Sequence, residues 1–259
     1  MLVGMLWVLC VDGLSFDIWE EFGYQLPHQS EMGIPQECYR NGVPFTPDVW
    51  GSMFLGSVYK HPKSKETELN PLRLRARRFL RNHGIAWSRR GAKVVPKGRG
   101  DAVPSYLVFQ QMPHKTVLED YNSFSWGIPA VCDGFTFKSY QGNVQDHEAF
   151  KSMVFSTYCR SFDLVAIYTH LIDEVAHRVI RRGDRNWRRL KYLYSEVHTL
   201  YQAITRRGEE VLLVSDHGCL GGHTHKAFIG SDQEFQVDNI LDVRSEIERR
   251  MERILGVKG

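Results

Sequence analysis

The stretch Val211-Leu-Leu-Val-Ser-Asp-His-Gly218 decides the fold predicted for this chain. Its uninterrupted apolar run ends abruptly in Asp216 and His217, as a buried parallel strand does when it reaches the edge of a sheet. Open α/β sheets bind their ligands at the carboxyl ends of their strands. A carboxylate beside an imidazole at that edge indicates a metal site. An ordinary polar turn explains Asp-His-Gly equally well. A metal site is favoured only if other predicted strands also end in residues that can bind a metal.

Other segments alternate between strand and helix in the same way. Further strands are predicted at 2–11 and 162–169, with a short piece at 227–229, and helices at 16–22, 47–55, 146–159, 172–182, 187–205 and 238–255. In the second helix, Thr46 followed by Pro47 is typical of an N-cap with proline at the first helical position. The alternation predicts an α/β fold with a mostly parallel central sheet and helices on both faces.

The domain organisation follows from length and regularity. The chain has 259 residues, of which 42% are hydrophobic, so it can bury a sizeable core. We expect one α/β domain over 1–259, with a small insertion or cap within about 58–145, where the sequence is least regular. Within it we expect a basic helix at 69–82, a loop at 91–104 and strand pieces at 106–110 and 128–132.

Cysteine usage and hydropathy indicate in which cellular compartment the protein is expected. The five cysteines are odd in number and have no CxxC or CxxxC spacing, so they predict reduced thiols in a cytoplasmic protein. No run approaches the ~18 apolar residues that a membrane span needs. The apolar start runs directly into Asp12 without a basic region or cleavage site, which favours a first strand over a signal peptide.

The net charge of +3 conceals two basic segments. Residues 60–100 contain thirteen Lys or Arg against two acids, and residues 178–191 contain seven against one. Such segments suit a polyanionic partner such as nucleic acid, although solvated helix faces have the same composition. The sequence does not predict an oligomeric state.

Further candidate ligands follow the other predicted strands. Asp12 ends the first strand, and Asp173 lies a few residues past the strand at 162–169. His177 is four residues after Asp173, so both side chains would lie on one face of a helix. His223 lies in a glycine-rich loop that can fold back over the site, with His225 as the alternative. Six carboxylate and imidazole groups are thus expected at one sheet edge.

Five blocks of sequence carry a resemblance to a known family. They are Val-Asp12-Gly, Phe-Thr46-Pro-Asp-Val-Trp-Gly-Ser-Met-Phe-Leu-Gly56, Asp173-x-x-x-His177, Ser-Asp216-His217-Gly and Gly-His223-Thr. In this order they resemble the alkaline phosphatase superfamily. The branch with the most similar pattern is the type I phosphodiesterase and nucleotide pyrophosphatase group, including its compact prokaryotic members. The blocks fall within roughly 1–57 and 160–230.

The resemblance implies an alkaline phosphatase-like fold with two divalent metal ions, zinc or alternatively manganese. One ion would be held by Asp173, His177 and His223, and the other by Asp12, Asp216, His217 and the Thr46 hydroxyl. Thr46 would be the nucleophile. A metal can lower the pKa of a threonine hydroxyl enough for attack, and backbone amides at a helix N-terminus suit a phosphoryl group. Thr46 acting only as an N-cap, and Ser52 as a rival nucleophile, are the alternatives.

The function implied is hydrolysis of phosphodiester or nucleotide substrates through a phosphothreonine intermediate. The alternatives are a phosphomonoesterase with the same site and a non-catalytic nucleic-acid-binding protein on this fold. A sulfatase is disfavoured because the segment at Thr46 lacks the Cys/Ser-x-Pro-x-Arg pattern. The substrate-binding residues are not predicted; candidates for steadying the phosphate are Lys93, Lys97, Arg99 and Asn122.

Overall fold

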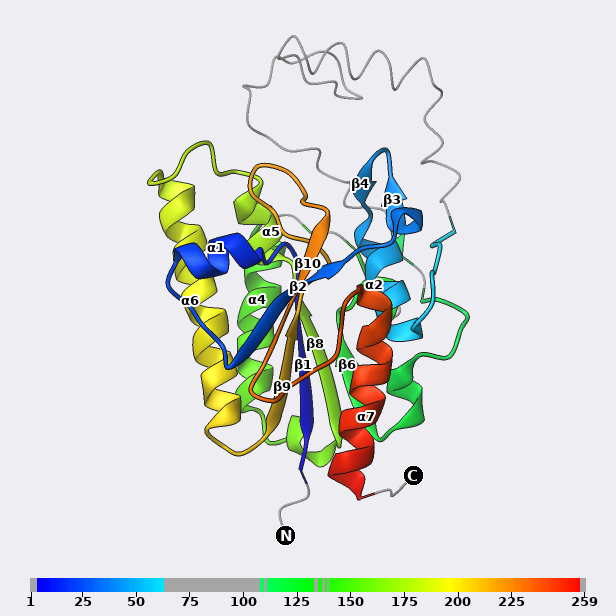
Figure 1. The fold of residues 1–259 in the computed structure, drawn as a ribbon. Helices are drawn as coiled ribbons and strands as arrows, with labels where there is room; N and C mark the ends of the chain where they lie inside the picture. Colours follow the sequence, from blue (N-terminus) through cyan, green and yellow to red (C-terminus); the bar gives the residue numbers. More distant parts are fainter. Residues whose placement is uncertain are drawn as a thin grey trace.

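The centre of the molecule is a six-stranded sheet in the order β2-β10-β9-β1-β8-β6 (Figure 1). The structure is a computed structural model that describes residues 4–62, 108–109, 111–132, 135–136, 138 and 140–256. The six strands are β1 (Leu6–Val11), β2 (His28–Gly33), β6 (Ser123–Trp126), β8 (Leu164–Thr169), β9 (Glu210–Val214) and β10 (Lys226–Ser231). Among these six, β10 runs antiparallel to its neighbours and the rest are parallel, which confirms the predicted sheet.

Helices cover both faces of this sheet (Figure 1). They are α1 (Phe16–Glu21), α2 (Thr46–Leu55), α4 (Tyr140–Phe155), α5 (Leu171–Ala176), α6 (Arg185–Thr205) and α7 (Val243–Leu255). Residues of α4, α5 and α6 share a core with Trp7, Leu9 and Val11 of β1, whereas residues of α2 and α7 share a core with Leu6, Val8 and Cys10. Because β1 is buried on both sides, its sequence is continuously apolar and does not alternate with polar residues.

Two short antiparallel pairs lie outside the central sheet. They are β3 (Tyr39–Arg40) with β4 (Val43–Pro44), and β5 (Val108–Phe109) with β7 (Phe135–Thr136). The β3–β4 pair leads directly into α2, so it positions the N-terminus of that helix.

The register of the parallel strands sets the level of the sheet edge. Val11 pairs with Thr169, and Cys10 pairs with Val214, so β1, β8 and β9 end side by side. In Figure 1 these ends point away from the amino end of β1, toward α1 and α5. The residues that follow the three strands are therefore brought to one place, as the sequence predicted.

Several predicted boundaries are wrong. β2 is absent from the predicted strands, and its sequence, HQSEMG, contains one buried apolar residue, Met32. The strand expected at 128–132 lies instead at Ser123–Trp126. α4 begins at Tyr140, six residues before its predicted start, and α5 ends at Ala176 because tighter hydrogen bonds, such as Arg178 N–H to Val175 O, replace the helical pattern.

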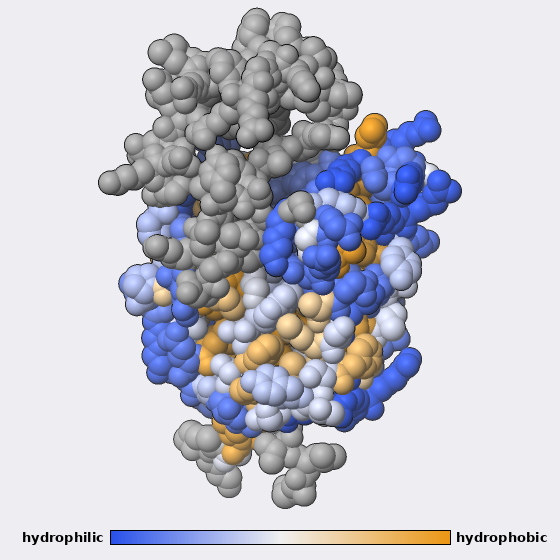
Figure 2. All heavy atoms as spheres, turned by 180° about the vertical axis from the view of Figure 1, so that it is seen from behind, coloured by the Kyte–Doolittle hydropathy of each residue, from blue (hydrophilic) through white to orange (hydrophobic). Residues whose placement is uncertain are grey.

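Figure 2 shows the face opposite to that in Figure 1, with hydrophilic residues along its margins and apolar ones gathered toward its middle. The five cysteines form no disulfide, as predicted. No helix among the described residues is long and apolar enough to cross a membrane. The expected insertion within 58–145 lies largely outside the described residues, as do the basic segment 60–100 and Lys93, Lys97 and Arg99.

Candidate metal centre

Asp12 lies at the carboxyl end of β1, fully buried. Its Oδ2 atom accepts hydrogen bonds from the Tyr168 hydroxyl at 2.5 Å and from His170 Nδ1 at 2.6 Å. Its Oδ1 atom has no hydrogen-bond partner in the described part of the chain and lies 3.3 Å from His217 Nε2. One oxygen is thus used to orient the carboxylate, and the other faces the cluster.

Asp216 and His217 follow β9, and both are fully buried. Neither carboxylate oxygen of Asp216 has a hydrogen-bond partner among the described residues. His217 Nδ1 faces the Gly218 carbonyl at 3.3 Å, which assigns the proton to Nδ1 and leaves Nε2 with a lone pair. That Nε2 lies 3.3 Å from Asp216 Oδ2, so acceptor atoms face one another. A cation between them would convert this repulsion into coordination.

Asp173, His177 and His223 form the adjoining group. His177 Nε2 lies 3.4 Å from Asp173 Oδ1 and 3.0 Å from His223 Nε2. His223 Nδ1 lies 3.3 Å from the Pro44 carbonyl, which favours a proton on Nδ1 and leaves Nε2 free to ligate. The prediction of His223 over His225 agrees with this geometry, because His225 is exposed and its ring lies 5.2 Å from that of Tyr39.

The two groups are contiguous. The His217 and His223 rings stack with their centroids 3.8 Å apart. Four sets of ligand atoms lie within 4.8 Å of one another in the described residues: Asp173, His217 and His223; Asp173, His177 and Cys219; Asp12, His170 and Asp173; and Asp12, Asp216 and His217. All six carboxylate and imidazole residues predicted for this edge are therefore brought together.

Thr46 is the first residue of α2 and is buried beside the same cluster. Its Oγ1 atom lies 3.4 Å from His217 Nε2. The N-cap position belongs to Phe45, whose carbonyl accepts from the amides of Asp48 and Val49, so the prediction of Thr46 as the N-cap is wrong by one residue. The Thr46 side chain makes no capping bond and is available to the site.

Few helix amides remain for a ligand at this point. Pro47 has no amide hydrogen, and the next two amides of α2 are satisfied by Phe45. The expected cradle of backbone amides at the N-terminus of α2 is therefore wrong. Ser52, the rival nucleophile, donates to the Asp48 carbonyl at 2.6 Å and accepts from the Tyr59 amide at 2.8 Å, so its hydroxyl serves the helix and the following loop.

The charges in the centre are unevenly balanced. Burial and the negative charge of Asp12 raise the pKa of Asp216 well above its ordinary value. Burial is the largest single influence on Asp12 and Asp173 and opposes their ionisation. The neighbouring histidines together outweigh it, chiefly His170 for Asp12 and His177 for Asp173, so the pKa of both is lowered.

The imidazoles respond in opposite directions. Burial and the neighbouring His223 lower the pKa of His217 to about 4, so this ring is neutral near pH 7. Burial disfavours a charged His170 as well, but the neighbouring carboxylates, chiefly Asp12, together outweigh it and raise the pKa of His170 to about 9. Burial and the charge of Asp173 raise the pKa of the Cys219 thiol, so the centre lacks a thiolate at neutral pH.

This donor set fits divalent metal ions. Three buried carboxylates lie together, and four of their oxygens, Asp12 Oδ1, Asp173 Oδ1 and both of Asp216, have no hydrogen-bond partner in the described ranges. Buried charged groups are stable only when paired or coordinated. Mixed carboxylate and imidazole ligands suit zinc, manganese and related ions.

His170 and Tyr168 also lie at the centre, although the sequence did not single them out. His170 is not among the predicted ligands, yet it contacts Asp12 and lies 3.9 Å from Asp173 Oδ2. Tyr168 was not considered. The signal was present, because both follow or end a predicted strand at the same edge as Asp12. Asn122 is wrong as a phosphate-steadying candidate, since it precedes the amino end of β6, at the opposite edge, and its amide donates to Ser161 O.

Comparison with known proteins gives the fold. No protein-family model matches the chain, and no curated protein sequence matches it. Alkaline phosphatase from the Antarctic bacterium TAB5 superposes with a TM-score of 0.50 at 8% identity, over 98% of each chain. The PH0037 protein from Pyrococcus horikoshii gives 0.47 at 9% identity over 100% of this chain and 98% of that one. The lipoteichoic acid synthase LtaP from Listeria monocytogenes gives a TM-score of 0.48 at 9% identity, over 98% of this chain and 72% of that one. The chain has an alkaline phosphatase-like fold.

Proposed function

We propose that this chain is a metal-dependent phosphoester hydrolase. The observation that carries the proposal is the cluster of buried carboxylate oxygens without hydrogen-bond partners among the described residues, at the ends of β1, β8 and β9. The Thr46 hydroxyl, which makes no capping bond, lies beside this cluster, 3.4 Å from His217 Nε2. A hydrolase of this kind needs both parts: ligands that hold divalent cations, and a nucleophile at their side. The alkaline phosphatase-like fold supports the proposal without specifying the reaction.

The two groups of ligands suggest how two ions would be shared. Asp173, His177 and His223 would hold one, and Asp12, Asp216, His217 and the Thr46 hydroxyl the other. Both would be zinc, or alternatively manganese. When bound, such ions lower the pKa of a coordinated hydroxyl and offset the charge of the transferred phosphoryl group.

Thr46 is the proposed nucleophile. Its Oγ1 atom would attack phosphorus while the bond to the leaving oxygen breaks, which gives a phosphothreonine and releases the alcohol. Water would then attack the same phosphorus and return Thr46 and a phosphate product. Helix α2 holds Thr46 rigidly because nine of its ten residues are buried. A fixed position lets attack proceed without first ordering the nucleophile.

The substrates we propose are phosphodiesters or nucleotides, following the branch that the sequence blocks resemble. A phosphomonoesterase would use the same centre and differ in how it holds the phosphate. A panel of nitrophenyl monoesters and diesters, assayed with added zinc or manganese, separates the two. Inactivity toward both esters, with metal bound, would overturn the proposed function.

Substitution of Thr46 tests the nucleophile. Thr46→Ala is expected to lose about a thousand-fold or more in turnover while retaining its metal, because the hydroxyl that forms the covalent bond is gone. The readouts are kcat on the active nitrophenyl ester and metal content by mass spectrometry. Ser52→Ala is the control, since its hydroxyl serves hydrogen bonds within the helix and loop, and it should keep activity. Full activity in Thr46→Ala would remove Thr46 from this role.

A further inference from the structure

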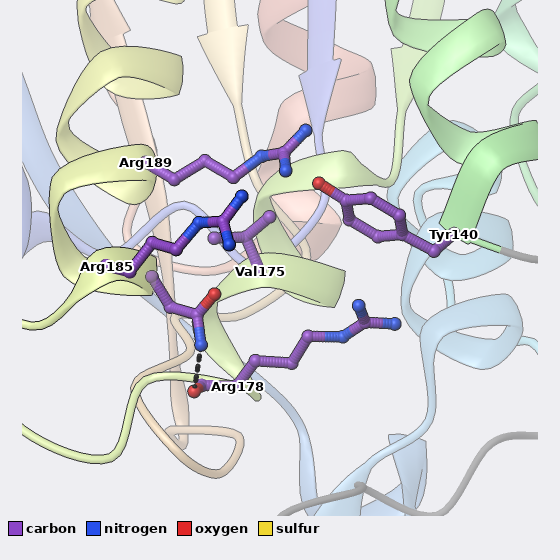
Figure 3. Close-up of a pocket in the computed structure, with 6 residues that line it drawn as sticks. Tyr140, Val175, Arg178, Arg185 and Arg189 are labelled. Atoms are coloured by element: carbon purple, nitrogen blue, oxygen red, sulfur yellow. Dashed lines mark hydrogen bonds between the residues drawn. The ribbon is translucent and has the colours of Figure 1, made fainter.

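A hollow of about 360 Å³ lies between α4, α5 and α6 (Figure 3). None of its lining residues belongs to the groups that could hold a metal. They come from the first residue of α4, from α5 and the chain just after it, and from the first turns of α6: Tyr140, Val175, Arg178, Arg185, Asn186 and Arg189. The basic segment 178–191 is therefore not a uniform charged face, because three of its arginines line one cavity.

The hollow carries more positive charge than its surroundings neutralise. Arg178 pairs with Glu174 on α5. Among the described residues no acidic side chain lies within ion-pair distance of Arg185 or Arg189, which are four residues apart on α6. Like charges at this spacing destabilise a helix by about 0.2–0.5 kcal/mol. An anion bound in the hollow would offset that cost.

Four of the residues around the hollow contact one another: Tyr140, Arg178, Asn186 and Arg189. The guanidinium carbons of Arg178 and Arg189 lie 4.4 and 4.7 Å from the centre of the Tyr140 ring. Asn186 Nδ2 donates to the Arg178 carbonyl at 2.7 Å, which ties α6 to the end of α5. The Tyr140 hydroxyl is buried and has no hydrogen-bond partner in the described part of the chain, and in Figure 3 it points toward the side where Arg185 and Arg189 lie. Fixed donors of this kind bind an anion without first losing side-chain freedom.

We propose that this hollow binds a phosphate group, either as inorganic phosphate or on a small phosphorylated molecule. Guanidinium groups match the oxygens of phosphate with paired hydrogen bonds, and the Tyr140 hydroxyl adds a further donor. Two arginines without acidic partners balance a dianion, whereas a single carboxylate would leave one of them uncompensated. None of the lining residues is a proposed metal ligand, and this proposal does not depend on the hydrolase reaction.

The geometry favours a small ligand over a nucleic acid strand. The volume is near the lower end of the range for small-molecule pockets, roughly 300–1,000 Å³. Proteins that bind single strands need aromatic faces on which bases stack. The Tyr140 ring, the aromatic ring that lines the hollow, is already covered by the guanidinium groups of Arg178 and Arg189.

The test compares two double variants that remove the same charge. Arg185→Gln with Arg189→Gln removes two arginines of the hollow. Arg181→Gln with Arg188→Gln removes two exposed arginines of the same segment that do not line it. Titration calorimetry measures inorganic phosphate binding to the intact chain at constant ionic strength, and a labelled single-stranded oligonucleotide provides the second arm. Any phosphate that binds at the metal centre should contribute equally to the titrations of both variants, so it does not alter the difference between them.

The expected result is a phosphate affinity about ten-fold or more weaker in the first variant, and unchanged in the second. Ester turnover should stay within about two-fold of the unsubstituted chain in both, which separates this site from the proposed reaction. Equal phosphate binding in all three proteins would overturn the proposal. So would an oligonucleotide that binds more tightly than phosphate and is weakened equally by both variants, since that indicates a general basic surface.

Discussion

Asp216 is the residue that best tests whether the centre binds cations. Both of its oxygens lack hydrogen-bond partners, and burial beside Asp12 raises its pKa. In the chelated protein Asp216→Asn removes a carboxyl group whose ionisation is unfavourable in the folded state, so the free energy of unfolding at neutral pH should rise by about 1 kcal/mol or more. With zinc added, the variant should gain less stability than the unsubstituted chain because a ligand is lost. Urea unfolding with EDTA and with zinc measures both effects.

Asp48 provides the matched control for that experiment. It is equally buried, but Arg40 Nη2 lies 2.7 Å from its Oδ1, and the His61 amide donates to the same oxygen at 2.9 Å. Asp48→Asn should therefore lower stability with and without zinc. If Asp216→Asn also destabilises the chelated protein, the unpaired charge at residue 216 is not the feature that we infer.

Tyr168 is predicted to act on metal binding through Asp12. Its hydroxyl donates to Asp12 Oδ2 at 2.5 Å, and its ring packs edge-on to Trp50 at 5.8 Å. Tyr168→Phe keeps the ring but leaves the carboxylate less firmly oriented. Groups that orient metal ligands are typically worth about ten- to a hundred-fold in affinity, so zinc binding should weaken by at least about ten-fold. Competition with a chromophoric chelator measures this, and an unchanged affinity would contradict the role.

The residue scale also shows what the sequence could predict. Asp173 and His177 were found because their spacing places them on one helix face, and Asp216 because it ends an apolar run. His170 was missed because its partner, Asp12, is 158 residues away and meets it through the pairing of β1 with β8. The strand-end rule that selected Asp12 applies equally to His170. Cys219 could not have been placed, because loop geometry alone brings it near Asp173.

At the scale of elements, Glu196 joins α6 to α4. Lys151 Nζ donates to it at 2.5 Å, and His147 Nε2 lies 3.4 Å away. Burial opposes its ionisation, but His147 and Lys151 outweigh burial and lower its pKa from 4.5 to about 2. A lowered pKa stabilises the folded state fully above pH 4.5, and this contribution is lost as the pH falls toward 2.

Glu196→Gln should accordingly lower the free energy of unfolding by about 1–2 kcal/mol at pH 7. The difference from the unsubstituted chain should shrink as the pH approaches 2, where Glu196 is itself protonated. Urea unfolding at pH 7 and at acidic pH measures it. Glu148→Gln is the control, because its side chain is 62% exposed and its pair with Lys151 at 2.9 Å is open to solvent. A pH-independent loss in Glu196→Gln would indicate lost packing instead.

The elements that were predicted and those that were missed differ in burial. β1, β8 and β9 were predicted because strands covered on both faces are continuously apolar. β2 lies at the edge of the sheet, where five of its six residues need not be buried, so its sequence does not alternate. The early start of α4 was missed because its first turn, from Tyr140, has few apolar residues and lines the arginine hollow. The secondary structure of β2 and of the first turn of α4 is therefore set by their position in the folded protein and not by the periodicity of their sequences.

At the scale of the whole molecule, the fold is shared far more widely than the sequence. The chain and the TAB5 alkaline phosphatase share 8% of their residues over 98% of each chain. The predicted ligands lie at strand ends, where the sheet edge fixes their positions whatever residues fill the core. Many apolar sequences can fill such a core, provided volume and pattern are kept. The short sequence blocks that supply residues to this sheet edge therefore predicted the fold. The rest of the sequence could not predict it, because many different apolar residues can fill the core.

Removal of metal should weaken the whole fold, because the centre joins residues that follow β1, β8 and β9 to the start of α2. An ion present at about a hundred times its Kd adds about 2.7 kcal/mol to the free energy of unfolding. For a chain of this length that corresponds to a Tm about 5–10 °C lower after chelation. Repulsion among Asp12, Asp173 and Asp216 should add to the loss.

Differential scanning calorimetry of the purified chain, with EDTA and after zinc is restored, measures this change. Recovery of the original Tm on adding zinc shows that chelation did not damage the protein. Asp216→Asn provides an internal control, since its Tm should respond less to the chelator. A Tm that is the same with zinc and with EDTA would contradict a metal bound between these strands, and the proposed hydrolase with it.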